Sequence, residues 1–194
     1  MNILKSITII SLSATLLLAG QGNHKKKDNT LKSVVKTGQQ STKLLLKTLG
    51  KNMKKNMKAG GPMKALDFCS QEAYNLTDKV NKELNKGVSI KRISMKYRNP
   101  ANKPSADEMA VLKALKTLKS ANVILPKHIV EKVNATTYKF YKPLVINKQV
   151  CLKCHGDVQN KKLKAEIEKR YPNDKATHYK MGDLRGAVVV TIKK

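Results

Sequence analysis

Five residues near the carboxyl end, Cys151 to His155, carry the clearest chemistry in the chain. They read Cys-Leu-Lys-Cys-His, and C-x-x-C-H is the attachment signature of a c-type haem. Residues three and four apart share one face of a helical turn. Both thiols can therefore bond the two vinyl groups of a porphyrin, while the imidazole lies under the ring as an iron ligand. We expect one covalently attached haem c, held by Cys151, Cys154 and His155.

Two other uses of paired cysteines fit the sequence less well. A redox dithiol usually lies in a thioredoxin-like βαβ pattern, which the sequence does not show. A closed zinc site needs four ligands, generally including a second nearby pair, and the chain has no second C-x-x-C. A chance pentapeptide in a cytosolic protein is the remaining alternative, so the cellular compartment bears on how the motif is interpreted.

The first 20 residues have the features of an export signal. Lys5 supplies a positive start, a mostly apolar run extends over 7–18, and small residues follow at Ala19, Gly20 and Gly22. The run is shorter than the roughly 20 apolar residues that span a bilayer. We therefore expect a signal peptide over residues 1–20 and a periplasmic protein, with an uncleaved membrane anchor as the alternative.

The chain is strongly basic, with 40 Lys and Arg against 13 Asp and Glu and a net charge of +27. An exported protein seldom meets nucleic acid, and the sequence shows no DNA- or RNA-binding motif. We expect no nucleic-acid partner. The charge favours an acidic redox or signalling protein, or an anionic membrane surface. A solvated surface that merely reflects a lysine bias is the other interpretation.

The lysines are densest over residues 22–58, which contain 11 Lys and a single acid, Asp28. Apolar residues recur there near helical spacing. We expect a long basic amphipathic helix that either lies on anionic lipid or packs as the first helix of the domain. Gly60-Gly61-Pro62 then interrupts the helix, and residues 59–194 form the haem-binding domain.

The remaining residues indicate an α+β fold, with helices at one end of a small antiparallel sheet. We expect helices over 63–86, 105–120 and 160–170, and a weaker helix after Pro126. We expect strands over 88–98, 136–147 and 187–192. The alternation of apolar residues slips between Ile90 and Ile93, which predicts a bulge. The β-branched run at 187–192 predicts a central strand.

Several segments together resemble a bacterial family of single-haem c-type cytochromes, formerly a domain of unknown function. The segments are 65–69 (Ala-Leu-Asp-Phe-Cys), 88–102, 141–144 (Tyr-Lys-Pro-Leu), 151–155 and 182–186 (Gly-Asp-Leu-Arg-Gly). The resemblance covers roughly residues 30–194. It implies a PAS-like fold, with the N-terminal helices packed around one haem. It also implies an unusual iron ligation, with His155 on one side and Cys69 on the other.

The residues themselves leave other sixth ligands open. Cys69 is the one cysteine outside the motif, and most free cysteines are small buried hydrophobes. Methionine is the usual partner of His in electron-carrying cytochromes c. The other candidate ligands are Met63, Met95, Met109, Met181, His128 and His178. Arg98, Arg185 and several lysines are candidates to neutralise the haem propionates.

A thiolate ligand would favour ferric iron and a low reduction potential. Reduction and protonation of the sulfur would then open a position for a diatomic gas. We therefore expect a redox or diatomic-gas sensor that signals through a separate protein. The alternative is a low-potential electron-transfer cytochrome that docks on an acidic redox partner. The sequence shows no distal His–Arg pair, so we expect no enzymatic activity.

Overall fold

The computed structural model describes residues 21–194, with side chains from Asn29 onward. The predicted export signal, residues 1–20, lies outside the described residues. The chain divides into two compact units, residues 1–32 and 33–194, and the fold below is that of the second unit. In the described part of the chain, no helix is long and apolar enough to cross a membrane.

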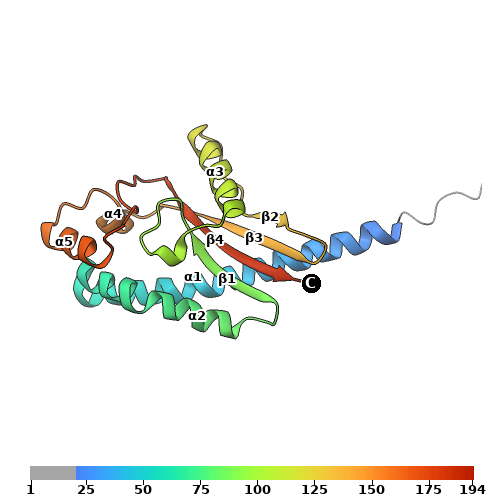
Figure 1. The fold of residues 1–194 in the computed structure, drawn as a ribbon, viewed down its shortest axis with the longest axis horizontal. Coiled ribbons are helices and arrows are strands. Elements are labelled where there is room, and N and C mark those ends of the chain that lie inside the picture. Colours follow the sequence, from blue (N-terminus) through green and yellow to red (C-terminus); the bar gives the residue numbers. More distant parts are fainter. Residues whose placement is uncertain (1–20) are drawn as a thin grey trace, which may run out of the picture. The chain divides into compact units, whose positions relative to one another are not determined.

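An antiparallel sheet of four strands lies at the centre of this unit (Figure 1). The strands are β1 (Val88–Ile93), β2 (Ile129–Lys132), β3 (Thr137–Val145) and β4 (Leu184–Lys193), in the order β1-β4-β3-β2. Strand β4 is central, as its run of β-branched residues predicts. Together with the helices, this sheet confirms the expected α+β fold.

Five α-helices accompany the sheet in the described residues. They are α1 (Gln21–Gln71), α2 (Ala73–Glu83), α3 (Ala106–Ser120), α4 (Gln149–His155) and α5 (Lys161–Arg170). Helix α1 is kinked at Gly60 and Gly61, and Gly61 has a φ of 63°, which favours glycine. The helix predicted over 63–86 is thus the last part of α1 followed by α2, with a break at Glu72.

Apolar side chains cover both faces of the sheet. Val188, Val190 and Ile192 of β4 pack against α1 and α2, in a cluster that includes Val34 and Leu45. Ala187 and Val189, the alternate residues, pack on the other face beside Leu112 of α3. Figure 1 shows α1 and α2 on one side of the sheet and α3 on the other. The expectation that the basic helix packs into the domain therefore holds from Val34 onward.

Two expectations about the strands are wrong. Strand β1 pairs with β4 in continuous register, without a bulge between Ile90 and Ile93. Ile90 and Ile93 point to opposite faces, and each is buried because both faces are covered. Residues after Pro126 form β2 rather than a weak helix, since Ile129 and Val130 pair with the aromatic residues of β3. The register irregularity lies instead in β3, between Leu144 and Val145.

Helix α1 lies close against the sheet at Gly38. A Cβ atom placed there would lie 2.2 Å from Cγ of Phe140, whose side chain is fully buried in β3. A Cβ atom on Gly50, in the same helix, would meet nothing within 4 Å. The two glycines therefore separate the effect of packing from that of helix propensity.

Gly38→Ala is expected to lower the free energy of unfolding by about 1–3 kcal/mol, because the methyl group overpacks the contact with Phe140. Gly50→Ala is expected to raise it by up to about 1 kcal/mol, because alanine favours a helix at an open position. Urea unfolding followed by circular dichroism measures both. Equal stability of the two variants would contradict the packing of α1 on β3.

Candidate functional site

The C-x-x-C-H residues form one short helix, α4, as their spacing predicts. Strand β3 leads into this helix through Ile146, which is tied at both backbone groups to the turn before β4. Its N–H donates to the carbonyl of Asp183 at 2.9 Å, and its carbonyl accepts from the N–H of Gly182 at 2.7 Å. Gly182 has a φ of 85°, which favours glycine in this turn. The start of α4 is thus fixed to the central sheet.

Three cysteines, all free thiols, lie at the junction of several elements. Cys151 packs beside Ile146 and the segment that precedes β4. Cys154 packs where Leu66 of α1 meets the buried face of α5. Cys69, in the last turn of α1, packs against the core beneath the sheet. Figure 1 shows α4 and α5 beside this end of α1.

The ring of His155 is oriented by a backbone carbonyl and by a neighbouring aromatic ring. Its Nδ1 donates to the carbonyl oxygen of Ala176 at 3.0 Å, which leaves Nε2 as the nitrogen with a free lone pair. The Tyr179 ring stands edge-on to the imidazole, with 6.3 Å between the ring centroids. Burial, together with the nearby Arg185 and Arg98, lowers the pKa of His155 to about 3. The side chain is therefore a neutral imidazole, the form that binds a metal.

Arg98 connects α4 with the segment that holds His155. Its Nη2 donates to the carbonyl of Cys154 at 2.7 Å and to that of Ala176 at 3.3 Å. Its guanidinium also pairs with the Asp174 carboxylate, at 2.8 Å, and both side chains are less than a tenth exposed. Asp174 in turn accepts from the Ala176 N–H at 2.7 Å. Arg98 and Asp174 thus fix the carbonyl that orients the imidazole.

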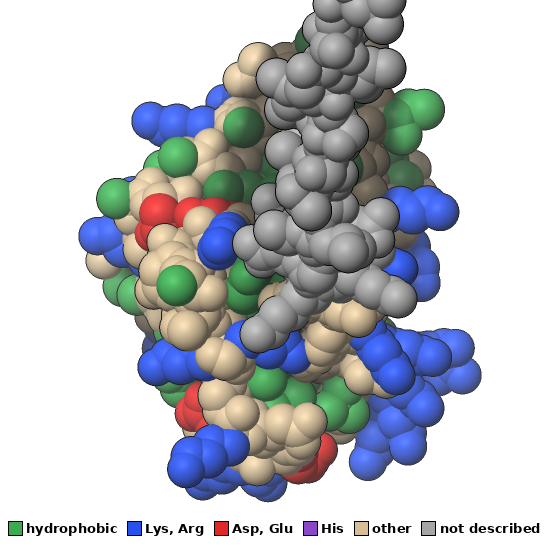
Figure 2. Space-filling model, turned by 90° about the vertical axis from the view of Figure 1, so that its right-hand side faces the viewer, with side chains coloured by type: hydrophobic (Ala, Val, Ile, Leu, Met, Phe, Trp, Pro, Cys, Tyr) green, Lys and Arg blue, Asp and Glu red, His purple; other side chains and the backbone are tan. Residues whose placement is uncertain are grey.

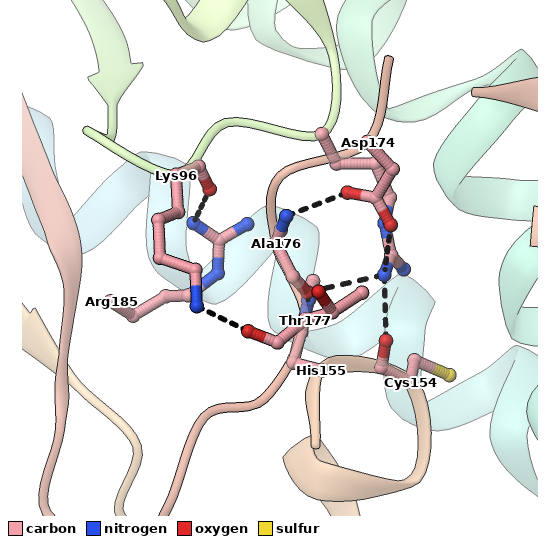
Figure 3. Close-up of polar contacts among 8 residues, drawn as sticks. Lys96, Cys154, His155, Asp174, Ala176, Thr177 and Arg185 are labelled. Carbon is pink, nitrogen blue, oxygen red and sulfur yellow. Dashed lines mark hydrogen bonds and ion pairs between the residues drawn. The ribbon is translucent and has the colours of Figure 1, made fainter. Parts of the chain in front are cut away.

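Two further cations lie on the other side of His155. Arg185 donates from Nη1 to Ser94 Oγ at 2.8 Å and to the carbonyl of Lys96 at 3.2 Å, and Lys96 Nζ donates to the carbonyl of Thr177. Both cations stack over Tyr179. Figure 3 shows Lys96 and Arg185 side by side, close to His155 and Thr177. Neither cation pairs with a carboxylate among the described residues.

Cys69 lies in the electrostatic field of this cluster. Burial raises the pKa of its thiol to about 11, and Arg92 of β1 acts most strongly in the opposite direction. The Cys154 thiol is close enough to raise the pKa of Cys69 as well. Within the described chain, the buried Nε of Arg92 has no hydrogen-bond partner. The site therefore holds a buried cationic donor that lacks an anionic acceptor.

The family of the chain follows from comparison with known proteins. A family model described as Tll0287-like matches residues 23–193. The chain belongs to the Tll0287-like family. A solved structure described as the crystal structure of the cyanobacterial heme-protein Tll0287 is similar, with 22% identity and a TM-score of 0.57. The match covers 86% of this chain and 96% of the other. No curated protein matches.

These findings confirm that the chain belongs to a family with a haem protein among its members, and they support the same α+β fold. The PAS-like description and the ligation by His155 and Cys69 stay predictions. So does the division into segments 1–20, 22–58 and 59–194.

The alternative candidates for the sixth ligand lie in different parts of the structure. His128 stacks on Phe140, and His178 is exposed beside Asp157. Met181 is exposed and Met95 packs on the α3 side of the sheet. Met63 is different, because it packs in the same cluster as Cys154.

The zinc alternative gains no support from the structure. In residues 21–194, no three His, Cys, Asp or Glu side chains are grouped to hold a metal ion by themselves. A structural zinc site needs four such ligands.

Sequence reasoning did not find Arg92, Asp174, Ala176 or Tyr179. Ala176 acts through its carbonyl oxygen, which carries no sequence signal. Asp174 is 76 residues from Arg98, so the pairing required the fold. Arg92 looked like one of several basic residues interleaved in a strand.

Arg98→Ala is expected to lower the free energy of unfolding by about 3–5 kcal/mol, because it leaves the buried Asp174 carboxylate unpaired. Lys164→Ala is the control, since Lys164 is 63% exposed and pairs with Glu168 at 4.0 Å. Its loss should change stability by less than about 0.5 kcal/mol. Denaturant titration of both purified variants is the measurement. A small effect of Arg98→Ala would mean that the pair does not hold the site together.

Proposed function

We propose that the protein is a periplasmic c-type cytochrome that carries one haem and senses redox state or a diatomic gas. The observation that carries the proposal is the neutral imidazole of His155, fixed through Nδ1 directly after two half-buried thiols. The family relationship supports it, because the solved relative is described as a heme protein. The predicted export signal supports the periplasmic location.

The residues of the site fit a covalently attached haem. Cys151 and Cys154 would hold the haem, since each thiol would add its S–H across one vinyl group, with sulfur bonding one carbon and the hydrogen going to the other. This addition needs no oxidant. Bound haem supplies an iron that cycles between two oxidation states. Nε2 of His155 is the nitrogen available to that iron.

The positive charges of the site fit the anionic propionates of a haem and a thiolate ligand. Arg92 lacks an acceptor at Nε, and Arg185 and Lys96 bond only to neutral oxygens. Anionic propionates and a thiolate are the partners that such buried cations need. Arg98 is already paired with Asp174. Of the two arginines singled out from the sequence, Arg185 is therefore the better candidate for a propionate.

Cys69 is the proposed second axial ligand. Its half-buried thiol packs beneath the sheet, and Arg92, Arg98 and Arg185 all favour its anionic form. It also lies in a short helical segment, bounded by the kink at Gly60–Gly61 and by the break at Glu72. Such a segment can shift without unfolding the rest of α1. Release of the Cys69 sulfur on reduction would thus both open a coordination position and move this segment.

Covalent attachment is tested by replacing both thiols of α4. The wild-type protein, exported together with haem, is expected to keep its haem after denaturation and to show the pyridine-haemochrome spectrum of haem c. Cys151→Ala with Cys154→Ala should lose all haem on denaturation. Cys69→Ala is the control and should keep it, because Cys69 makes no thioether. Wild-type protein without bound haem would overturn the proposed function.

Axial ligation is tested by comparing Cys69→Ser with Met63→Leu, two changes in the same end of α1. Absorption and electron paramagnetic resonance spectra of the oxidised protein should change with Cys69→Ser and stay unchanged with Met63→Leu. We also expect the reduction potential to rise in Cys69→Ser, because an electron-rich thiolate favours ferric iron. The opposite pattern would identify Met63 as the ligand.

The same spectra separate a sensor from an electron carrier. A sensor is expected to change coordination on reduction and to bind carbon monoxide in the reduced state. A carrier keeps six ligands in both states. A wild-type spectrum that stays six-coordinate on reduction would therefore favour the alternative, a low-potential electron-transfer cytochrome.

A further inference from the structure

Helix α1 carries a continuous line of lysines on the side that faces away from the core. The line consists of Lys36, Lys43, Lys47, Lys51, Lys54 and Lys58. Successive members are three, four or seven residues apart, so they share one face of the helix. All six are exposed. We call this set the lysine stripe.

The opposite face of the same helix packs in the core. Val34, Leu45 and Leu49 are buried in the cluster beneath the sheet. The stripe lies half a turn away from them, ahead of the kink at Gly60. Over 22 residues it extends about 33 Å, at 1.5 Å per residue. The fold therefore presents the stripe as a straight outer edge of one rigid helix.

The positive charge of the stripe is not compensated locally. Residues 29–66 contain no Asp or Glu. None of the six lysines makes an ion pair with a described residue. On the face drawn in Figure 2, Lys and Arg lie around much of the edge, and Asp and Glu occupy small areas. An extended anionic surface is the partner that this pattern fits.

We propose that α1 binds along the surface of an anionic phospholipid bilayer through the lysine stripe. Specific protein interfaces concentrate aromatic and arginine anchors at their centre and are depleted in lysine, whereas the stripe contains lysine alone. Phosphate headgroups need only point charges, which lysine provides. The apolar face of α1 is already buried, so the helix rests on the headgroups and does not insert.

The proposal uses the charges of α1 and does not depend on the haem. Its failure would leave the proposed function untouched. If both hold, the protein works at the membrane surface, with Cys69 at the far end of the helix that binds the bilayer.

The test measures binding of the full chain to vesicles of phosphatidylcholine with and without phosphatidylglycerol. In the stripe variant, Lys43, Lys47, Lys51 and Lys54 are changed to Gln. In the control variant, Lys103, Lys113, Lys127 and Lys162 are changed to Gln, which removes the same charge from exposed positions elsewhere. Glutamine and lysine have similar helix propensities, and circular dichroism verifies that both variants fold.

Wild type and the control variant are expected to sediment with vesicles that contain phosphatidylglycerol, at 0.1 M salt, and not with phosphatidylcholine alone. The stripe variant should bind at least ~100-fold more weakly, since each lysine near an anionic surface contributes about a fivefold factor. Binding should weaken in 0.5 M salt. Equal losses in both variants would assign binding to net charge and overturn the proposal. No binding by wild type would also overturn the proposal. An acidic protein surface would then be the partner of the lysine stripe.

Orientation provides a second readout, because the chain contains no Trp. Leu44 lies beside the stripe and Leu118 lies on α3, and the two are 36% and 37% exposed. Fluorescence of Leu44→Trp is expected to be quenched by vesicle lipids that carry a nitroxide on the headgroup, and that of Leu118→Trp is not. Equal quenching, or quenching of Leu118→Trp alone, would contradict the proposed orientation.

Discussion

The buried pair of Arg98 and Asp174 is the contact on which the candidate site depends. Arg98 reaches the carbonyl of Cys154, at the end of the C-x-x-C-H turn, and the carbonyl of Ala176. Asp174 holds the backbone N–H of Ala176. The two side chains thus join α4 to the segment that fixes the His155 ring. Without this connection α4, a helix of seven residues, would have little to hold His155, its proposed axial ligand, in one orientation.

The charges around this pair explain why the site suits an anionic group. Arg92, Arg98 and Arg185 all act on the pKa of Cys69, and Asp174 is the carboxylate placed against Arg98. Burial lowers the pKa of Arg92 and of Arg185, and among the described residues neither cation pairs with a carboxylate. Propionates and a thiolate would supply the missing negative charge. Burial lowers the pKa of His155, and Arg185 and Arg98 act in the same direction. The same two arginines, with Arg92, oppose the rise that burial causes in the pKa of Cys69.

The sequence predicted those features that depend on local pattern. The spacing of Cys151, Cys154 and His155 placed them on one helical turn, and the run 187–192 gave the central strand. The errors arose where tertiary context decides. Ile90 and Ile93 break the alternation of a strand that is buried on one face, which predicts a bulge, whereas both faces of this sheet are covered. Residues after Pro126 form a strand because β3 offers an edge to pair with. Contacts between distant segments, such as Arg98 with Asp174, leave no periodic signal.

Helix α1 contributes to the core, to the charged surface and to the candidate site. Its buried face packs on the sheet, its outer face carries the lysines, and its final segment carries Cys69. The kink at Gly60–Gly61 separates that final segment from the rest. Gly61 adopts a φ of 63°, a conformation that costs other residues free energy. If the proposed bilayer contact holds, a helix bound to both the sheet and the membrane would not easily move as a whole. The kink would then let the Cys69 segment shift on release of its sulfur from a bound haem, while the remainder of α1 stays in place.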